Sequence, residues 1–175
     1  MMTDTIPAPE IRETHLYDML RRLDIAWHTI EHAPVFTVEA SADIYARLSG
    51  GHTKNLFLKD KKGGLWLAVV QAHLRVDLPA LAKQLGSPRF SFGSAELLES
   101  TLGISPGSVT PFALMNDTAH VVTPVLDAAM LEVDPLNFHP MRNDRTTAIA
   151  PDDLVRFVKA CGQTPVIAPI PEKAD

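Results

Sequence analysis

The chain has 175 residues, of which 46% are hydrophobic and 21% charged, and its formal net charge is −5. This composition is typical of one globular domain with a core of ordinary size. The acidic balance argues against a protein that coats DNA or RNA, because such proteins are usually basic. No apolar run approaches the roughly 20 residues that cross a bilayer, so we expect a cytoplasmic protein without a membrane partner. The single cysteine, Cys161, excludes an internal disulfide and a multi-cysteine zinc site.

The chain begins with a polar, proline-containing stretch over residues 1–10, which we expect to be a flexible arm. Apolar residues at helical spacing, with arginines on the other side, then predict an amphipathic helix. The elements predicted next are, in chain order, this helix over 11–23, a strand over 26–30, an extended segment over 32–37 that Pro34 favours, and a helix that Thr37 or Ser41 caps and that ends near Leu48.

A β-hairpin is predicted after Gly50-Gly51. Two apolar runs, 56–58 and 65–70, flank the basic, glycine-rich segment 60–64, which is typical of a tight turn. Lys54 opens the first strand, where a lysine is either a solvated strand end or a cation that contacts phosphate or a reacting oxygen. Local pattern leaves both interpretations open. The same holds for the other basic clusters, which are Lys59 with Lys61 and Lys62, and Arg142 with Arg145.

The second half of the chain mixes short helices and strands with two loops shaped by glycine and proline. The predicted elements are, in chain order, a helix over 78–85, a strand over 87–92, a helix over 94–103, a loop over 103–111, strands over 112–115, 120–122 and 131–133, a loop over 138–143, a strand over 146–149 and a helix over 154–160. Strict βαβ alternation is missing, so we predict an α/β single domain with a mixed central β-sheet flanked by helices. Its predicted limits are 11–165, followed by a flexible tail over 166–175.

Several familiar catalytic motifs are missing from the sequence. It has no Walker-type loop, no Rossmann glycine fingerprint, no Gly-x-Ser-x-Gly elbow and no His-Glu-x-x-His helix. Its seven histidines are scattered without the convergence that a metal site needs, so we expect neither a metal nor a cofactor. Three segments still have the composition of a functional site, and these are Lys54-Asn55, Gly107-Ser108-Val109-Thr110-Pro111 and His139-Pro140.

These segments belong to a longer series that spans about residues 11–162. The series consists of His32-Ala33-Pro34 with Phe36-Thr37, Lys54-Asn55-Leu56-Phe57-Leu58, Gly107 to Phe112, Asn116-Asp117, and His139-Pro140 with Asn143, Thr146 and Thr147. In this order it resembles the free-standing prolyl-tRNA editing proteins, the ProX/YbaK group, which is related to the insertion editing domain of bacterial prolyl-tRNA synthetase. Each segment alone is weak, and together they are specific. The arm over 1–10 is not part of the pattern.

Within that group, the segments Lys54 to Leu58 and Gly107 to Phe112 resemble the alanine-specific branch, which hydrolyses Ala-tRNA(Pro). The cysteine-specific branch usually has Thr after its lysine and a different Gly-x-x-x-Pro loop. The resemblance implies a catalytic Lys54 and a substrate site that comprises Phe36, Thr37, Asn55, the Gly107–Pro111 loop and His139. It also implies that the partner is the acceptor end of tRNA(Pro), with prolyl-tRNA synthetase as a candidate second partner and no DNA.

An aminoacyl ester is already activated, so its hydrolysis needs a positioned water and stabilisation of the developing oxyanion rather than a strong nucleophile. We therefore expect Lys54 to bind the terminal phosphate or the ester region. Backbone N–H groups of the Gly107–Pro111 loop are expected to hold the carbonyl oxygen or the ribose, and His139 to bound the pocket. The resemblance implies that the 2′-hydroxyl of the terminal adenosine takes part. Two alternatives stay open: a deacylase of Ser- or Cys-tRNA, and a non-catalytic module that binds an aminoacyl end.

Overall fold

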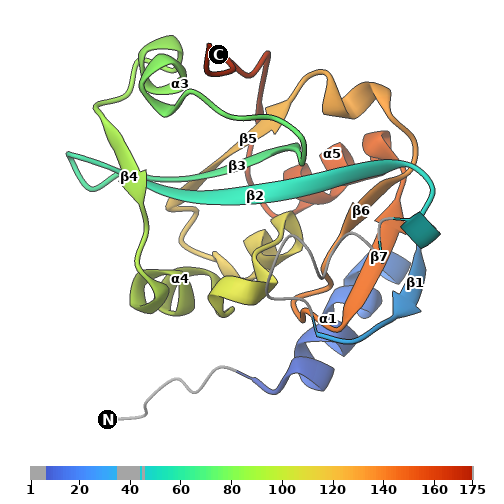
Figure 1. Ribbon diagram of the computed structural model, residues 1–175. Coiled ribbons are helices and arrows are strands. Elements are labelled where there is room, and N and C mark those ends of the chain that lie inside the picture. Colours follow the sequence, from blue (N-terminus) through green and yellow to red (C-terminus); the bar gives the residue numbers. More distant parts are fainter. Residues whose placement is uncertain (1–6, 35–43, 45, 175) are drawn as a thin grey trace, which may run out of the picture.

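The strands of the protein form one mixed sheet. A computed structural model describes residues 7–34, 44 and 46–174. Its strands are β1 His28–Glu31, β2 Gly51–Asp60, β3 Leu65–Gln71, β4 Phe90–Phe92, β5 Val122–Asp127, β6 Leu136–Phe138, β7 Arg145–Ile149 and β8 Val166–Ala168. Within the described residues they build an 8-stranded sheet in the order β1-β7-β6-β2-β3-β5-β8, with β4 paired to β2 (Figure 1). The β2–β3 pair is antiparallel, whereas β2–β6, β3–β5 and β5–β8 are parallel. The predicted α/β class with a mixed sheet is confirmed.

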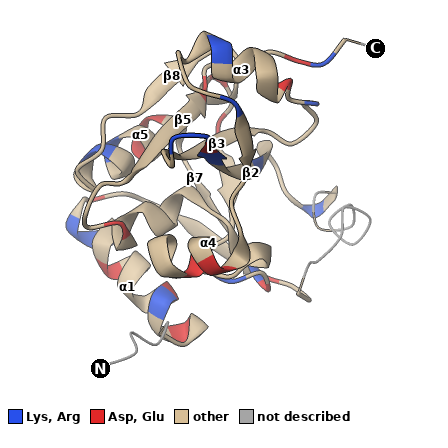
Figure 2. Cartoon of the chain, turned by 90° about the vertical axis from the view of Figure 1, so that its left-hand side faces the viewer, with Lys and Arg blue, Asp and Glu red and all other residues tan. Residues whose placement is uncertain are grey.

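Helices lie around this sheet, and those whose bounds fall within the described residues are α1 Pro9–Arg22, α3 Leu78–Gln84, α4 Ala95–Leu102 and α5 Pro151–Ala160. Side-chain caps start two of them, because Asp77 accepts the Ala80 N–H and Ser94 accepts the Leu97 N–H. Charged residues of both signs lie along α1 (Figure 2). None of the described helices is both long and apolar enough to span a membrane.

The predicted helices at 11–23, 78–85, 94–103 and 154–160 are confirmed. The helix predicted to end near Leu48 falls largely on residues outside the described part of the chain.

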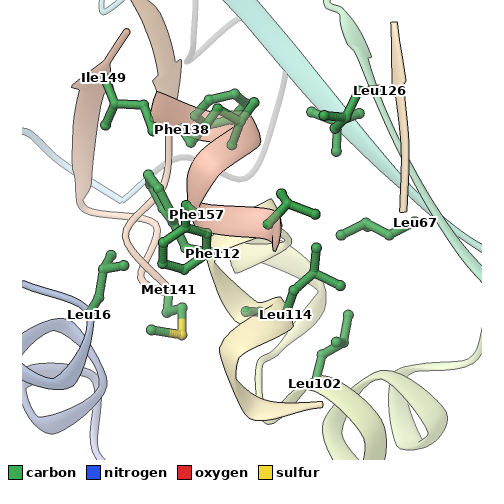
Figure 3. Packing of buried hydrophobic residues seen from close by; sticks show 14 of the residues in the cluster. Leu16, Leu67, Leu102, Phe112, Leu114, Leu126, Phe138, Met141, Ile149 and Phe157 are labelled. Carbon is green, nitrogen blue, oxygen red and sulfur yellow. The ribbon is translucent and has the colours of Figure 1, made fainter. Parts of the chain in front are cut away.

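Strand β2 separates two hydrophobic clusters, because successive side chains of a strand point to opposite faces. Phe57 enters the larger cluster, in which Phe112 packs edge-on against Phe138 and Phe157 (Figure 3). Leu58 enters the smaller cluster with residues of β3 and α3. Helix α3 accordingly lies on one side of β2 and helix α4 on the other (Figure 1). Even-numbered residues of β2 therefore share the face that α3 covers.

The described residues include three short 3-10 helices, namely η1 Pro106–Ser108, η2 Pro111–Asn116 and η3 Met130–Glu132. Helix η1 lies within the predicted loop over 103–111, whereas η2 and η3 lie where strands were predicted. The strand predicted over 112–115 is wrong, because Pro111 begins η2 and the Thr110 hydroxyl accepts the Phe112 N–H. The strand predicted over 131–133 is also wrong, since η3 occupies most of it. Strand β6 was not predicted, because its three residues acquire strand geometry only through pairing with β2 and β7.

The C-terminal residues differ from the predicted tail. The three residues of β8 pair with β5 in parallel, with Leu126 opposite Ile167. Further on, Glu172 forms a β-bridge with Val76, and the Lys173 N–H donates to the Arg75 carbonyl over 2.8 Å. Three prolines close to a short apolar run concealed this pairing in the sequence. The C-terminal segment therefore pairs with β5 and with Arg75 and Val76, the residues that precede α3.

The Asn116-Asp117 motif has a structural task. Asn116 donates to the Leu102 carbonyl over 2.9 Å. The buried Asp117 carboxylate accepts the backbone N–H groups of Val121 and Val122 at 3.1 and 2.9 Å, and these residues lead into β5. The motif therefore joins the end of α4 to the start of β5, behind the loop that the sequence singles out.

Replacing this carboxylate should destabilise the fold. We expect Asp117→Ala to lower the free energy of unfolding by about 1–3 kcal/mol, because two backbone N–H groups lose their acceptor. Urea unfolding at 25 °C measures the change. The matched control is Asp152→Ala, which removes an exposed acid from the first turn of α5 and should cost at most about 1 kcal/mol. Equal losses in both variants would contradict this role for Asp117.

Candidate functional site

Lys54 lines a cavity with a volume of about 560 Å³. The cavity lies where the start of β2, the end of β3, η3 and β6 meet. Its polar lining comprises His52, Lys54, Gln71 and His73, and its apolar lining comprises Met130, Val133 and Leu136, with Gly50-Gly51 at the corner. A concave site with an apolar wall and a few polar groups is typical of a small-molecule pocket.

Glycine is required at the corner where β2 begins. Gly50 has φ of +89°, and a Cβ there would collide with the Pro135 carbonyl oxygen. The next residue, Gly51, donates its N–H to that same carbonyl over 2.8 Å. This close approach brings β2 beside β6 and places Lys54 three residues into the strand, at the cavity. The Gly-Gly pair therefore positions the lysine.

The Lys54 ammonium is half-buried and donates to the backbone carbonyl of Leu74. Burial lowers the pKa of Lys54 below its ordinary value, and no charged neighbour among the described residues contributes to the shift. An ammonium has three N–H donors, so Leu74 leaves two for other acceptors. This part of the cavity can hold a phosphate, a carbonyl oxygen or a developing oxyanion.

Asn55 points to the opposite face of β2. Its Nδ2 donates to the Val109 carbonyl over 3.1 Å, which ties β2 to the loop predicted for the site. Its Oδ1 is buried and has no hydrogen-bond partner among the described residues. The structure thus brings Asn55 together with the Gly107–Pro111 loop, whereas strand alternation separates Asn55 from Lys54.

The Gly107–Pro111 loop is packed into the protein rather than open along its length. Ser108 and Thr110 are buried, with 4% and 0% of their surface exposed. The Ser108 N–H donates to the Ser105 carbonyl over 2.9 Å, and Pro111 starts η2. Gly107 lies in η1, between these two anchors. Of the predicted site residues that the structure describes, Lys54 lines the large cavity and this loop does not.

His139 follows β6 and is packed next to another histidine. Its Nδ1 donates to the Arg145 carbonyl over 2.9 Å, and its ring centroid lies 6.2 Å from that of His32. Burial, as the largest cause, lowers the pKa of His139. His32 in turn contacts the Thr146 hydroxyl over 2.8 Å. Residues from the first and last motif segments therefore meet beside β7. Phe36 and Thr37, also predicted for the site, lie outside the described residues.

Arg142 and Arg145, which the sequence left open as a phosphate contact, are engaged in ion pairs. Arg142 pairs with Asp144 at 2.5 Å, and Arg145 pairs with Glu31 at 2.6 Å. Glu13 of α1 lies within 4.0 Å of both guanidinium groups. These arginines therefore connect α1 and β1 to the loop before β7. In the described ranges, no group of three or more His, Cys, Asp or Glu side chains is placed to hold a metal ion.

Sequence reasoning missed part of the cavity. Gln71 ends β3 opposite Thr53 of β2, and only this pairing reveals that it lies near Lys54. His52 and His73 are two of the scattered histidines for which the sequence indicated no site. The signal that places all three at one site is the register of the hairpin, which a single sequence predicts only roughly.

Comparisons with known proteins agree with the motif series. Residues 32–157 match the aminoacyl-tRNA editing domain family. Prolyl-tRNA synthetase associated domain-containing protein 1 of Danio rerio is 41% identical over 162 residues, which cover 91% of this chain and 88% of that protein. The prolyl-tRNA editing protein ProX of Acetoanaerobium sticklandii is 35% identical over 146 residues, which cover 83% of this chain and 89% of that protein.

A solved structure described as a candidate trans-editing enzyme for prolyl tRNA synthetase has the same fold. It superposes with a TM-score of 0.70 at 17% identity, over 95% of this chain and 99% of its own. The family match covers most of the sheet, both motif-bearing loops and Lys54. The chain therefore belongs to the aminoacyl-tRNA editing domain family.

Proposed function

We propose that the protein is a trans-editing deacylase that hydrolyses the ester of mischarged Ala-tRNA(Pro). The observation that carries the proposal is the half-buried Lys54 ammonium at an apolar-walled cavity of about 560 Å³. Pockets that hold ligands of drug size measure about 300–1,000 Å³, and a terminal adenosine with its aminoacyl group is of that class. Family membership supplies the reaction class, and the alanine-specific motif segments supply the substrate.

The proposed reaction adds water to the ester carbonyl carbon. The carbonyl oxygen gains negative charge, the bond from carbon to the ribose oxygen then breaks, and the proton lost by water ends on that ribose oxygen. The products are alanine and tRNA(Pro). The Lys54 ammonium stabilises the charge on the carbonyl oxygen, because a cation in a partly desolvated site acts most strongly where charge develops. Asn55 acts indirectly by holding the Gly107–Pro111 loop through Val109.

Selectivity for alanine follows from the limits of the synthetase. A pocket made for proline rejects the smaller alanine only weakly, because missing methylene groups are worth only about 1–3 kcal/mol. A second site that accepts alanine and excludes proline removes the error, as in a double sieve. The negative net charge of −5 fits a protein that holds the acceptor end of a tRNA rather than its whole backbone.

A deacylation panel tests this function. The wild-type protein is incubated with Ala-, Ser-, Cys- and Pro-tRNA(Pro), and the loss of each aminoacyl ester is followed against a protein-free control. We expect Ala-tRNA(Pro) to be hydrolysed fastest and Pro-tRNA(Pro) to persist. Preferential hydrolysis of the Ser or Cys ester would move the assignment to another editing specificity. Hydrolysis of none of the four would support a non-catalytic module that binds an aminoacyl end.

The pH dependence should identify the charge state of Lys54 that acts. If the ammonium stabilises the oxyanion, kcat/KM, corrected for uncatalysed hydrolysis, falls as the pH rises through the pKa of Lys54. Burial places this pKa below 10.5. In Lys54→Arg, whatever activity remains should lose this limb, because a guanidinium stays protonated. A rate that rises over the same range and depends on Lys54 would contradict an ammonium role and indicate a neutral amine that acts as a base.

A further inference from the structure

A second, smaller cavity adjoins Lys54. We propose that it binds the single-stranded 3′ strand that leads to the terminal adenosine of the tRNA, with a base stacked on Phe92 and a phosphate held by Arg75 and Lys173. This cavity has a volume of about 270 Å³, and its lining includes Lys54, Leu56, Arg75, Leu78, Phe92 and Lys173. The proposal rests on the proposed function, because it names how the substrate of that site is held.

The cavity is built by segments that are distant in the sequence. Strand β4 pairs with β2 so that Phe92 lies opposite Leu58. Phe92 therefore joins the face of β2 that also carries Leu56 and Lys54. On the far side, the Lys173 N–H donates to the Arg75 carbonyl, which brings the C-terminal segment beside the residues that precede α3. The two cationic side chains thus line the cavity from neighbouring backbone positions.

Phe92 is a large aromatic side chain that lies mostly outside the hydrophobic core. Its side chain is 64% exposed, and it is the only aromatic residue among the large hydrophobic side chains that are exposed in the described part of the chain. An exposed aromatic ring beside cations is the arrangement on which proteins stack single-stranded bases, since every base has a π-face.

The charges around the cavity favour a phosphate. Lys54, Arg75 and Lys173 contribute three cationic side chains to its lining, and the described residues of that lining include no carboxylate. Glu172, the nearest acid along the C-terminal segment, lines a different cavity. Figure 2 shows segments of Lys and Arg around β2, β3 and α3, whereas α4 carries acidic segments. In a chain with a net charge of −5, this concentration of positive charge is local.

Lys54 connects the two cavities, because it lines both of them. An aminoacyl-tRNA has a matching order of parts: the ester joins the amino acid to the terminal ribose, and the preceding nucleotide follows through a phosphate. With the ester at Lys54 and the terminal nucleoside in the larger cavity, the preceding nucleotide falls to the smaller cavity. Its phosphate then lies near Arg75 and Lys173, and its base near Phe92.

Binding of unacylated RNA tests the proposal without the chemical step. The two probes are a tRNA(Pro) transcript and the same transcript without its single-stranded 3′ nucleotides, each measured by fluorescence anisotropy. We expect Phe92→Ala to raise the Kd of the full transcript about 5- to 150-fold, the range that base stacking on an aromatic residue supplies. For the truncated transcript, the Kd of Phe92→Ala should equal that of the wild-type protein. Phe92→Tyr should retain binding and Phe92→Leu should lose it, because only tyrosine keeps an aromatic face.

The phosphate contact has its own test. In Lys173→Gln, the slope of log K against log salt concentration should become less negative by about 0.7, the value for one phosphate of a single strand. Lys159→Gln, an exposed lysine of α5, is the matched control and should leave the slope unchanged. Wild-type binding by Phe92→Ala, or an equal loss on the truncated transcript, overturns the proposal. The two proposals can fail separately. If the binding proposal fails but the wild-type protein hydrolyses Ala-tRNA(Pro), the proposed function stands. If the predicted binding is found but the wild-type protein hydrolyses no ester, only the proposed function is refuted.

Discussion

Lys54→Ala should lower kcat/KM for Ala-tRNA(Pro) hydrolysis by about 10²- to 10³-fold, the loss observed when one oxyanion donor is removed from an enzyme. The physical reason is that Lys54 provides the ammonium at the larger cavity, and the apolar wall formed by Met130, Val133 and Leu136 offers no replacement. Single-turnover deacylation with enzyme in excess measures the effect on the chemical step. A loss confined to KM would assign Lys54 to binding rather than to stabilisation of the transition state.

The matched control for this variant is Lys59→Ala. Lys59 lies on the same strand and is exposed, so its removal changes the net charge equally without reaching the cavity. We expect its rate to equal that of the wild-type protein. Full hydrolysis by a folded Lys54→Ala protein would show that the lysine has no part in the reaction.

Phe112→Ala should have the largest effect on stability, with a loss of about 3–5 kcal/mol in the free energy of unfolding. Phe112 is fully buried, and its ring centroid lies 5.7 Å from that of Phe138 and 5.4 Å from that of Phe157. The substitution leaves a cavity between β6, η2 and α5, where the surrounding elements can relax only in part. Urea unfolding at 25 °C followed by circular dichroism measures the loss.

Phe92→Ala serves as the control, because it makes the same chemical change at a side chain that is 64% exposed. Its free energy of unfolding should stay within about 0.5 kcal/mol of the wild-type value. Equal losses in the two variants would contradict the central position of Phe112 in the core. The control also shows that the binding test of Phe92→Ala is made on a folded protein.

Local signals in the sequence predicted the parts of the fold that are formed by neighbouring residues. The hairpin was predicted because two apolar runs flank a glycine-rich turn, and the register confirms it with Lys54 opposite Val70. Helix α3 was predicted to end before Gly86, and α4 to start at Ser94 and end at Gly103, which indeed has φ of +67°. These elements need no distant partner to be recognised.

Strands β6 and β8 and the 3-10 helix η2 were not predicted. The apolar run after Pro111 has the composition of a strand, but the proline and the Thr110 cap make it the 3-10 helix η2. Strands β6 and β8 have three residues each and exist only through their pairing. A pattern of three residues carries too little periodicity to separate a strand from a loop.

The candidate site shows the same limit. The sequence singled out Lys54, Asn55 and the Gly107–Pro111 loop, and the hydrogen bond from Asn55 to Val109 joins two of these segments across 54 positions. Because side chains alternate along β2, Lys54 lies on the face of the strand opposite to Asn55 and the Gly107–Pro111 loop. The motifs alone did not indicate this separation. The contact between Arg75 and Lys173 depends on the attachment of the C-terminal segment. The roles of these residues in the reaction stay predictions that the variants address.

A competition experiment tests the central claim most directly. Equal concentrations of Ala-tRNA(Pro) and Pro-tRNA(Pro), with different labels on the two amino acids, are mixed with wild-type protein in one tube, and both esters are followed over time. In competition, the ratio of the two rates equals the ratio of the kcat/KM values, which is the measure of specificity. The editing account predicts that the alanyl ester disappears while the prolyl ester decays no faster than in a tube without protein. Equal loss of both esters would contradict it.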